Sequence, residues 1–228
     1  MIKGVLLDID GTLVLSNDAH AAAWVDAFAE SGYDVSFDAV RKLIGMGGDK
    51  LLSEVEPSLN EKTGDGKKIK EARTRIFLEK YVGQLKPTPG SRLLVESLQQ
   101  NGLRTMVASS AKQDELEALL KAAQVQDLLT EATTSDDADK SKPDPDIVLV
   151  ALDKIGLRPH EVIMVGDTPY DIEAAAKAGV ACIAVRSGGW KDEQLNDALG
   201  VYQDPQDLVR NQEEIITVVQ QYVERVSA

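Results

Sequence analysis

Two patterns of hydrophobic and polar positions alternate along most of the chain. Short apolar runs such as residues 2–7, where Val5, Leu6 and Leu7 are adjacent, are typical of strands buried on both faces of a parallel sheet. Between these runs, apolar residues recur at the spacing of amphipathic helices. Strands that alternate with such helices predict a parallel sheet with right-handed crossovers. The expected strands are 2–7, 104–108, 161–165, 180–185 and a weak one near Leu128, and the expected helices are 91–101, 113–123, 145–155 and 170–178.

The alternation is interrupted directly after the first strand. From residue 17 to about residue 31, Ala21, Trp24 and Phe28 recur at helical spacing, and Gly32 suits the end of a helix. This segment therefore opens a helical part of the chain, in which we expect further helices at residues 36–44, 49–55 and 66–82.

Pro87 and Pro89 mark the point at which strands and helices begin to alternate again. We therefore expect an α/β fold, a Rossmann-like open parallel sheet that carries an inserted all-helical cap domain. The α/β core would comprise residues 1–15 and 87–228, and the cap would comprise residues 16–86. In open α/β sheets, active sites lie at the carboxyl ends of the strands, so candidate chemistry is sought there.

Composition agrees with a folded, soluble protein. Apolar residues make up 43% of the chain and charged residues 28%, close to the averages of globular proteins. No apolar run approaches the ~20 residues of a membrane span, and the N-terminus lacks the pattern of a signal peptide. The single cysteine, Cys182, excludes an intramolecular disulfide framework. Together these features favour the cytoplasm and predict no membrane partner.

The charge of the chain argues against nucleic acid as a partner. The formal net charge is −13, which would repel a polyphosphate backbone. The acidity is uneven: residues 16–86 carry 11 Lys and Arg against 12 Asp and Glu, out of 25 against 38 in the whole chain. The inserted segment is thus nearly neutral, and the predicted core is acidic.

Two carboxylates, Asp8 and Asp10, follow the first predicted strand, and a turn begins at Gly11. Carboxylates at one strand end repel each other unless a cation binds there or one of them holds a proton. A nucleophile and a general acid need the same division of roles. The alternative interpretation is an ordinary acidic turn.

Hydroxyls follow the predicted strand 104–108, at Ser109 and Ser110. A hydroxyl between a strand end and a helix N-terminus is well placed to donate to a phosphate oxygen, with the helix N–H groups assisting. A plain helix N-cap explains the pattern equally well.

A lysine, Lys142, precedes the next good helix. Asp144 suits the N-cap of that helix and Pro145 its first residue. Lys142 has no capping role, and Pro143 restricts it to an extended backbone from which its ammonium can face a phosphate or the nucleophilic carboxylate. A solvated surface lysine is the alternative.

The apolar run 162–165 leads to a second pair of acids. Asp167 stands at the strand end and Asp171 in the first turn of the next helix. Such carboxylates suit a hard cation, and Mg²⁺ is the usual one when phosphate oxygens share its coordination. Acids that cap the helix are the alternative. Four motifs of this kind, each after an apolar run, indicate a shared site more strongly than any one of them does.

In the order of these motifs the sequence resembles the haloacid dehalogenase superfamily, specifically its phosphoglycolate-phosphatase and β-phosphoglucomutase-like branch with a helical cap after the first motif. The resemblance covers nearly the whole chain and implies Mg²⁺ as the cofactor. The residues that it implies are Asp8 as nucleophile, Asp10 as general acid and base, Ser109, Ser110 and Lys142 as phosphate-binding groups, Asp8, Asp167 and the backbone carbonyl of Asp10 as magnesium ligands, and Asp171 as an accompanying carboxylate.

The resemblance further implies a magnesium-dependent phosphatase. It would hydrolyse a small phosphorylated metabolite, of phosphoglycolate or sugar-phosphate type, through an aspartyl-phosphate on Asp8. Asp10 would protonate the leaving alcohol and then activate water. Members with an inserted cap are often monomers, so we expect a monomer.

Other members of this branch remain as alternatives. Haloacid dehalogenases lack a carboxylate at the position of Asp10, which counts against dehalogenation. A β-phosphoglucomutase-like mutase is the closer competitor, because His20 falls where that enzyme has a cap histidine; His20 is then either a catalytic helper or an orienting helix residue. Against the mutase, Gly48 replaces its sugar-phosphate-binding arginine, and Asp171 matches the phosphatases better. The glycines at 47 and 48 either end a helix or let the cap loop approach the site.

A third hypothesis is a binding or regulatory module that keeps the fold without the chemistry. The presence of both Asp8 and Asp10 speaks against it, because a binding protein needs no pair of nucleophile and acid.

Overall fold

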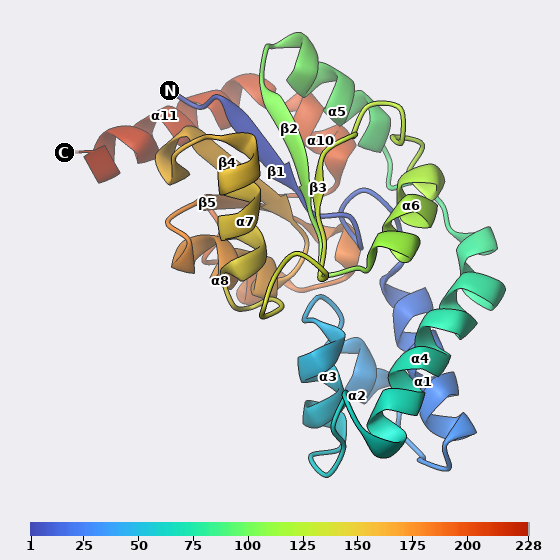
Figure 1. The fold of residues 1–228 in the computed structure, drawn as a ribbon. Helices are drawn as coiled ribbons and strands as arrows, with labels where there is room; N and C mark the ends of the chain where they lie inside the picture. The colour runs from blue at the N-terminus through green and yellow to red at the C-terminus, as the bar shows by residue number, and fades with distance from the viewer. Residues whose placement is uncertain (228) are drawn as a thin grey trace.

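A six-stranded parallel sheet forms the centre of the protein. The computed structural model describes residues 1–227. The strand order is β3-β2-β1-β4-β5-β6, so β1 lies between β2 and β4 in the middle of the sheet (Figure 1). This confirms the predicted α/β fold. The strands are β1 (Gly4–Leu7), β2 (Arg104–Ala108), β3 (Ala132–Thr133), β4 (Val162–Gly166), β5 (Ala181–Val185) and β6 (Gly200–Tyr202).

Helices cover both faces of the sheet, because successive residues of a strand point to opposite sides. Leu6 packs in a hydrophobic cluster with Ile147 and Ile172 on one face, whereas Leu7 packs in a second cluster with Leu94 and Leu116 on the other. Both faces of β1 are therefore buried, as its apolar sequence indicates. The helices after the insertion are α5 (Ser91–Gln100), α6 (Gln113–Ala122), α7 (Asp146–Ile155), α8 (Pro169–Lys177), α9 (Asp192–Leu195), α10 (Pro205–Arg210) and α11 (Gln212–Ser227).

The central position of β1 decides where the site lies. Leu7 is in register with Val107 of β2 and Val165 of β4, so these three strands end side by side. Asp8 directly follows β1 and therefore emerges between the ends of its two neighbours. This is the edge at which ligands bind in open α/β sheets.

The inserted helices lie beyond this edge of the sheet (Figure 1). The segments that lead into and out of the insertion lie side by side. The N–H of Leu15 donates a hydrogen bond to the carbonyl of Lys86 at 2.9 Å. Trp24 and Phe28 are buried in the insertion, as their helical spacing indicates. We keep the domain boundaries, 1–15 and 87–228 for the core and 16–86 for the cap, as a proposal. The helices of the insertion are α1 (Asn17–Glu30), α2 (Phe37–Arg41), α3 (Gly48–Val55) and α4 (Gly64–Ile76), and α4 continues into a π-helical turn at Phe77–Tyr81.

The structure corrects several predicted elements. The strand expected near Leu128 is wrong: the third strand is Ala132–Thr133, and the apolar residues Val125 and Leu129 are buried in the loop before it. α7 begins at Asp146 with Pro145 as its N-cap, one residue later than predicted. β6 and the helices after residue 190 were not predicted: β6, α9 and α10 are short, whereas α11 was missed although apolar residues recur along it at helical spacing.

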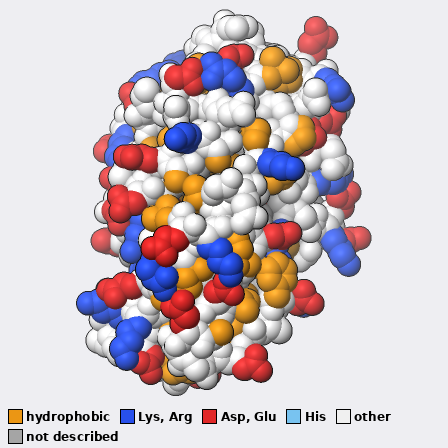
Figure 2. Space-filling model, turned by 90° about the vertical axis from the view of Figure 1, so that its right-hand side faces the viewer, with side chains coloured by type: hydrophobic (Ala, Val, Ile, Leu, Met, Phe, Trp, Pro, Cys, Tyr) orange, Lys and Arg blue, Asp and Glu red, His pale blue; other side chains and the backbone are white. Residues whose placement is uncertain are grey.

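The exposed charges and the lengths of the helices are two further features of the fold. On the face drawn in Figure 2, acidic and basic side chains are interspersed, so the net negative charge forms no single patch there. No helix of residues 1–227 is long and apolar enough to cross a membrane.

Candidate active site

The side chains of Asp8 and Lys142 meet at the end of β1. Lys142 Nζ lies 2.6 Å from Asp8 Oδ1 and 2.7 Å from Asp171 Oδ1, and it donates to the carbonyl of Ala108 at 2.8 Å. Lys142 is only 1% exposed. It is therefore not a solvated surface lysine. Burial by itself would lower its pKa, but the charges of Asp171 and Asp8 outweigh burial and raise the pKa above its usual value.

Three buried carboxylates gather around this ammonium. Asp8, Asp167 and Asp171 each place one oxygen within 4.8 Å of the others. Within residues 1–227, the ion pairs of this group involve one cation, Lys142. Burial, with Asp171 and Asp10 adding to it and Lys142 opposing it, raises the pKa of Asp8 to about 7. Burial and the charges of Asp171 and Asp8 also raise the pKa of Asp167 well above its usual value. One ammonium does not balance the negative charge of three carboxylates, so a bound cation would stabilise the group. Carboxylate oxygens are ligands that fit Mg²⁺.

Two neutral side chains fix the orientation of Asp167. The amide of Asn17 donates to Asp167 Oδ2 at 2.8 Å, and the hydroxyl of Thr12 lies 3.2 Å from Asp167 Oδ1 and 3.3 Å from Asp8 Oδ2. Sequence reasoning missed both residues, although each lies close in the chain to the first carboxylate pair. Gly11 makes this approach possible: its φ is +76°, and a Cβ there would lie 2.3 Å from Asp167 Oδ2.

Asp171 serves two partners at once. Its Oδ2 accepts hydrogen bonds from the backbone N–H of Thr168 at 3.1 Å and from the Thr168 hydroxyl at 2.7 Å. This is a capping box at the start of α8, so the capping interpretation is correct for that oxygen. Its other oxygen faces Lys142. The helix cap thus holds a carboxylate rigidly beside the ammonium.

The side chain of Asp10 lies apart from this acidic group, toward the inserted helices. Its Oδ1 accepts a hydrogen bond from the Ser16 hydroxyl at 2.5 Å and lies 2.6 Å from His20 Nε2. Burial opposes ionisation of Asp10, but its contacts with His20 and Ser16 and the charge of Arg73 outweigh burial and lower its pKa. The two carboxylates predicted at this strand end therefore have opposite pKa shifts: the pKa of Asp8 is raised and that of Asp10 is lowered.

His20 is held between Asp10 and Arg73. The Nη2 of Arg73 contacts His20 Nδ1, and the ring stacks on Phe77 with centroids 4.0 Å apart. An arginine only donates, so Nδ1 of His20 accepts the hydrogen bond from Arg73. The N–H at Nε2 of His20 then donates a hydrogen bond to Asp10. His20 thus contacts Asp10 and Arg73 at the same time. Sequence reasoning did not find Arg73, whose spacing on α4 carries no distinctive signal.

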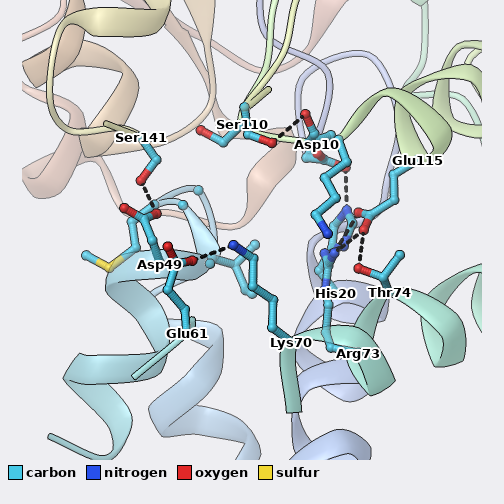
Figure 3. A pocket seen from close by; sticks show the side chains of 18 of the residues that line it. Asp10, His20, Asp49, Glu61, Lys70, Arg73, Thr74, Ser110, Glu115 and Ser141 are labelled. Carbon is cyan, nitrogen blue, oxygen red and sulfur yellow. Dashed lines mark hydrogen bonds and ion pairs between the residues drawn. The ribbon is translucent and has the colours of Figure 1, made fainter. Parts of the chain in front are cut away.

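Arg73 also joins the insertion to the core. Its Nη1 lies 2.6 Å from both oxygens of Glu115 on α6, and the hydroxyl of Thr74 donates to Glu115 Oε1 at 3.0 Å. Glu115 is 1% exposed. Figure 3 shows Asp10, His20, Arg73 and Glu115 grouped on one side of the cavity. The helical insertion is therefore closed onto the sheet edge in this structure.

The two serines after β2 differ in their surroundings. Ser109 Oγ accepts a hydrogen bond from the backbone N–H of Ala111 at 3.0 Å, whereas the buried Ser110 Oγ has no hydrogen-bond partner among residues 1–227 and lines the cavity. The N-cap of α6 is Lys112. The simple N-cap interpretation of Ser109 is therefore wrong.

A cavity of about 250 Å³ lies between the insertion and the sheet edge. Asp8 and Asp10 line it from the core side, and the loop that contains Gly47 and Gly48 lines it from the insertion. A Cβ at Gly47 would lie 2.0 Å from the Ser141 side chain, and one at Gly48 would lie 2.9 Å from Trp24. The structure thus favours close approach over helix termination for these glycines, which begin α3.

Comparisons with known proteins identify related sequences. The sequence profile of the Haloacid dehalogenase-like hydrolase family matches residues 5–185. The protein SUPPRESSOR OF QUENCHING 1, chloroplastic, of Arabidopsis thaliana is 35% identical over 192 residues, which are 82% of this chain but 18% of that protein. The phosphoglycolate phosphatase of Rhodospirillum rubrum is 27% identical over 215 residues, 90% of this chain and 88% of that protein.

The fold is also similar to that of solved structures. The crystal structure of a hydrolase from Pseudomonas syringae superposes with a TM-score of 0.87 and 29% identity, and it covers 93% of this chain and 99% of its own. With a family profile that spans most of the sequence and a shared fold, the chain belongs to the haloacid dehalogenase-like hydrolases and is an enzyme of that family.

Proposed function

We propose that this protein is a magnesium-dependent phosphatase that hydrolyses a small phosphate monoester, of phosphoglycolate or sugar-phosphate type, through an aspartyl-phosphate on Asp8. The observation that carries the proposal is the buried contact of Lys142 with Asp8 and Asp171, beside the carboxylate of Asp167. A buried ammonium that faces a carboxylate at the sheet edge suits binding of a phosphoryl group, because it balances negative charge as that group arrives. The similarity to a phosphoglycolate phosphatase supports the same class of reaction.

In the proposed mechanism, Asp8 attacks phosphorus and Lys142 balances the charge of the phosphoryl oxygens. Ser109 and Ser110 follow β2 at the same edge, and the unpartnered Ser110 hydroxyl is free to donate to the phosphate. Asp8 and Asp167, with the backbone carbonyl of Asp10, would hold Mg²⁺, while Asp171 positions Lys142. Bound there, the cation would supply Lewis-acid stabilisation of the phosphoryl oxygens.

Asp10 would transfer the protons. Both of its contacts with Ser16 and His20 use Oδ1, which leaves Oδ2 for the leaving-group oxygen and for water. The lowered pKa of Asp10 favours its ionised form, which is the form that can accept a proton from water in the second step. An incoming phosphate adds negative charge beside Asp10, which raises its pKa and favours the protonated form that the first step needs.

The test compares the wild type with Asp8→Asn on an aryl phosphate, with Mg²⁺ and with a chelator. We expect phosphate release by the wild type with Mg²⁺ only, and a loss of at least about a thousandfold in Asp8→Asn. Asp38→Asn, an exposed acid on α2, is the matched control and should retain wild-type activity. Equal phosphate release by the wild type and Asp8→Asn would refute the proposal.

A sugar-phosphate mutase is the second candidate, favoured by the contact of His20 with Asp10. It predicts isomerisation of β-glucose 1-phosphate that a bisphosphate stimulates. Release of free phosphate alone from that substrate would rule it out. The monomeric state and the cytoplasmic location remain predictions from the sequence.

A further inference from the structure

Two cations that line the cavity, Arg73 and Lys70, already form ion pairs with carboxylates of the protein. Arg73 is held by Glu115, and Lys70 contacts Glu61; all four residues line the cavity. Glu115 is 1% exposed and also accepts from Thr74, so it is not free to move aside. An anionic group on a substrate would therefore have to compete with carboxylates that the fold holds in place.

The N-terminus of α3 also points to this cavity, and the protein's own acid fills it. A helix N-terminus attracts anions, and α3 begins at Gly48 beside the cavity. Asp49 stands in the first turn of α3 and accepts a hydrogen bond from the Ser141 hydroxyl. Figure 3 shows the Asp49 and Ser141 side chains together, on the side of the cavity away from Asp10. The positive end of this helix is thus neutralised before any substrate enters.

The core side of the cavity adds further negative charge. Two exposed acids, Asp136 and Asp139, line the cavity on this side, together with one lysine, Lys112. Apart from Asp8 and Asp10, the cavity lining contains five acids and three cations. A second negative group on the substrate therefore meets net repulsion, whereas hydroxyl groups find carboxylate acceptors.

From this charge arrangement we infer that the substrate is a phosphate monoester whose organic part carries no second negative charge and bears hydroxyl groups. The inference rests on the proposed phosphatase function and narrows it. Among the types considered, it selects an uncharged polyol or sugar monophosphate over phosphoglycolate, which bears a carboxylate, and over bisphosphates.

A matched pair of substrates tests the inference. Phosphoglycolate and 2-hydroxyethyl phosphate share a two-carbon skeleton and differ in one terminal group, a carboxylate against a hydroxymethyl group. Glucose 1-phosphate and glucose 1,6-bisphosphate form a second pair. We expect kcat/KM to be at least about tenfold higher for the member without the additional negative group in each pair. Equal or reversed preference in the wild type overturns the inference.

Removal of one negative charge tests the cause. In Asp49→Asn, the ratio of kcat/KM for phosphoglycolate to that for 2-hydroxyethyl phosphate should rise about fivefold. Asp136→Asn, on the opposite wall, should shift the ratio in the same direction and guards against a folding defect in Asp49→Asn. The control Asp38→Asn, outside the cavity, should leave the ratio unchanged. A ratio that neither cavity variant shifts contradicts the electrostatic explanation.

The two proposals fail differently. If Asp8→Asn and the wild type release phosphate equally from every compound, the phosphatase function itself is wrong. If Asp8→Asn is inactive while the wild type prefers phosphoglycolate or the bisphosphate, the phosphatase function stands and the inference about the substrate alone is wrong.

Discussion

The guanidinium of Arg73, on α4, lies 2.6 Å from both carboxylate oxygens of Glu115, on α6. The same side chain contacts His20, whose opposite ring nitrogen lies 2.6 Å from Asp10. A series of contacts thus runs from Glu115 of the core through Arg73 and His20 of the insertion to Asp10. This ion pair therefore links one contact between the insertion and the core to the position of Asp10.

Removal of either partner of this pair should impair catalysis in a coupled way. Arg73→Met leaves Glu115 buried without a cation, and Glu115→Gln leaves Arg73 without its counter-charge. We expect each change to lower kcat/KM on an aryl phosphate by about 10- to 100-fold. The double variant should be no worse than the more damaged single variant, a coupling of at least about 1.4 kcal/mol.

The pair Lys80 and Asp26 provides the control for this double-mutant cycle. It lies within the insertion and is solvent-exposed, with 2.6 Å between Lys80 Nζ and Asp26 Oδ2. Its neutralisation should leave kcat/KM near the wild-type value. Additive effects of Arg73→Met and Glu115→Gln would show that the pair does not act as a unit.

Replacement of Lys142 by methionine should destabilise the fold as well as abolish activity. The change leaves Asp8 and Asp171 buried without their ammonium, and breaking a buried ion pair in this way costs about 3–5 kcal/mol. Urea unfolding in chelator measures the loss, and added Mg²⁺ should restore part of it by binding the folded carboxylates. Lys177→Met, which removes an exposed contact with Glu173, should change stability little. Unaltered stability of Lys142→Met would contradict the charge balance described for this group.

Addition of a single methyl group at Gly47 should impair closure of the insertion onto the core without lowering the stability of the fold. Gly47 has φ −66° and ψ 151°, which alanine adopts without strain, but its Cβ would lie 2.0 Å from Ser141. We expect Gly47→Ala to lower kcat/KM by about 10- to 100-fold, because the insertion closes less completely. Thermal unfolding should shift little. In Gly83→Ala, the added Cβ has no neighbour within 4 Å, so this variant should behave as the wild type. A wild-type kcat/KM in Gly47→Ala would show that the close approach of Gly47 to Ser141 is not needed for activity.

Stability should depend on pH through Glu161, far from the site. Hydrogen bonds from Arg158 and from Lys3, which lies 2.6 Å away, lower the pKa of Glu161 below its usual value of 4.5. Because the folded state has the lower pKa, this carboxylate stabilises the fold above pH 4.5 and progressively less as the pH falls below it. The urea midpoint of Glu161→Gln should therefore lie below that of the wild type at pH 7, and the two should converge toward pH 3. The exposed Glu131→Gln should show no such convergence; a constant difference for Glu161→Gln would point to packing instead of charge.

Periodicity identified most of the fold because the elements concerned are long or fully buried. β2 was predicted with its observed bounds, and α1 within one residue. β3, with two residues, and β6, with three, are too short for periodicity to detect. They form because the neighbouring strands offer unpaired backbone groups at the sheet edge, which is a property of the assembled sheet.

The candidate site was accessible to sequence reasoning where it follows strand ends. Asp8, Lys142, Asp167 and Asp171 meet in the structure because each lies near the carboxyl edge of one parallel sheet. The roles assigned to them remain proposals. Asn17, Arg73 and Glu115 were missed, because each lies within a helix where its residue type is common.

The sequence by itself determined the parallel sheet, the helical insertion after β1 and the acids at the strand ends, because these depend on local periodicity and on the rule that parallel strands end together. Only the tertiary structure decided that Lys142 is buried, that Asp10 faces His20 and that Arg73 joins α4 to α6. These contacts bring together residues far apart in the chain. The charges in the cavity, and with them its selectivity, depend on that assembly.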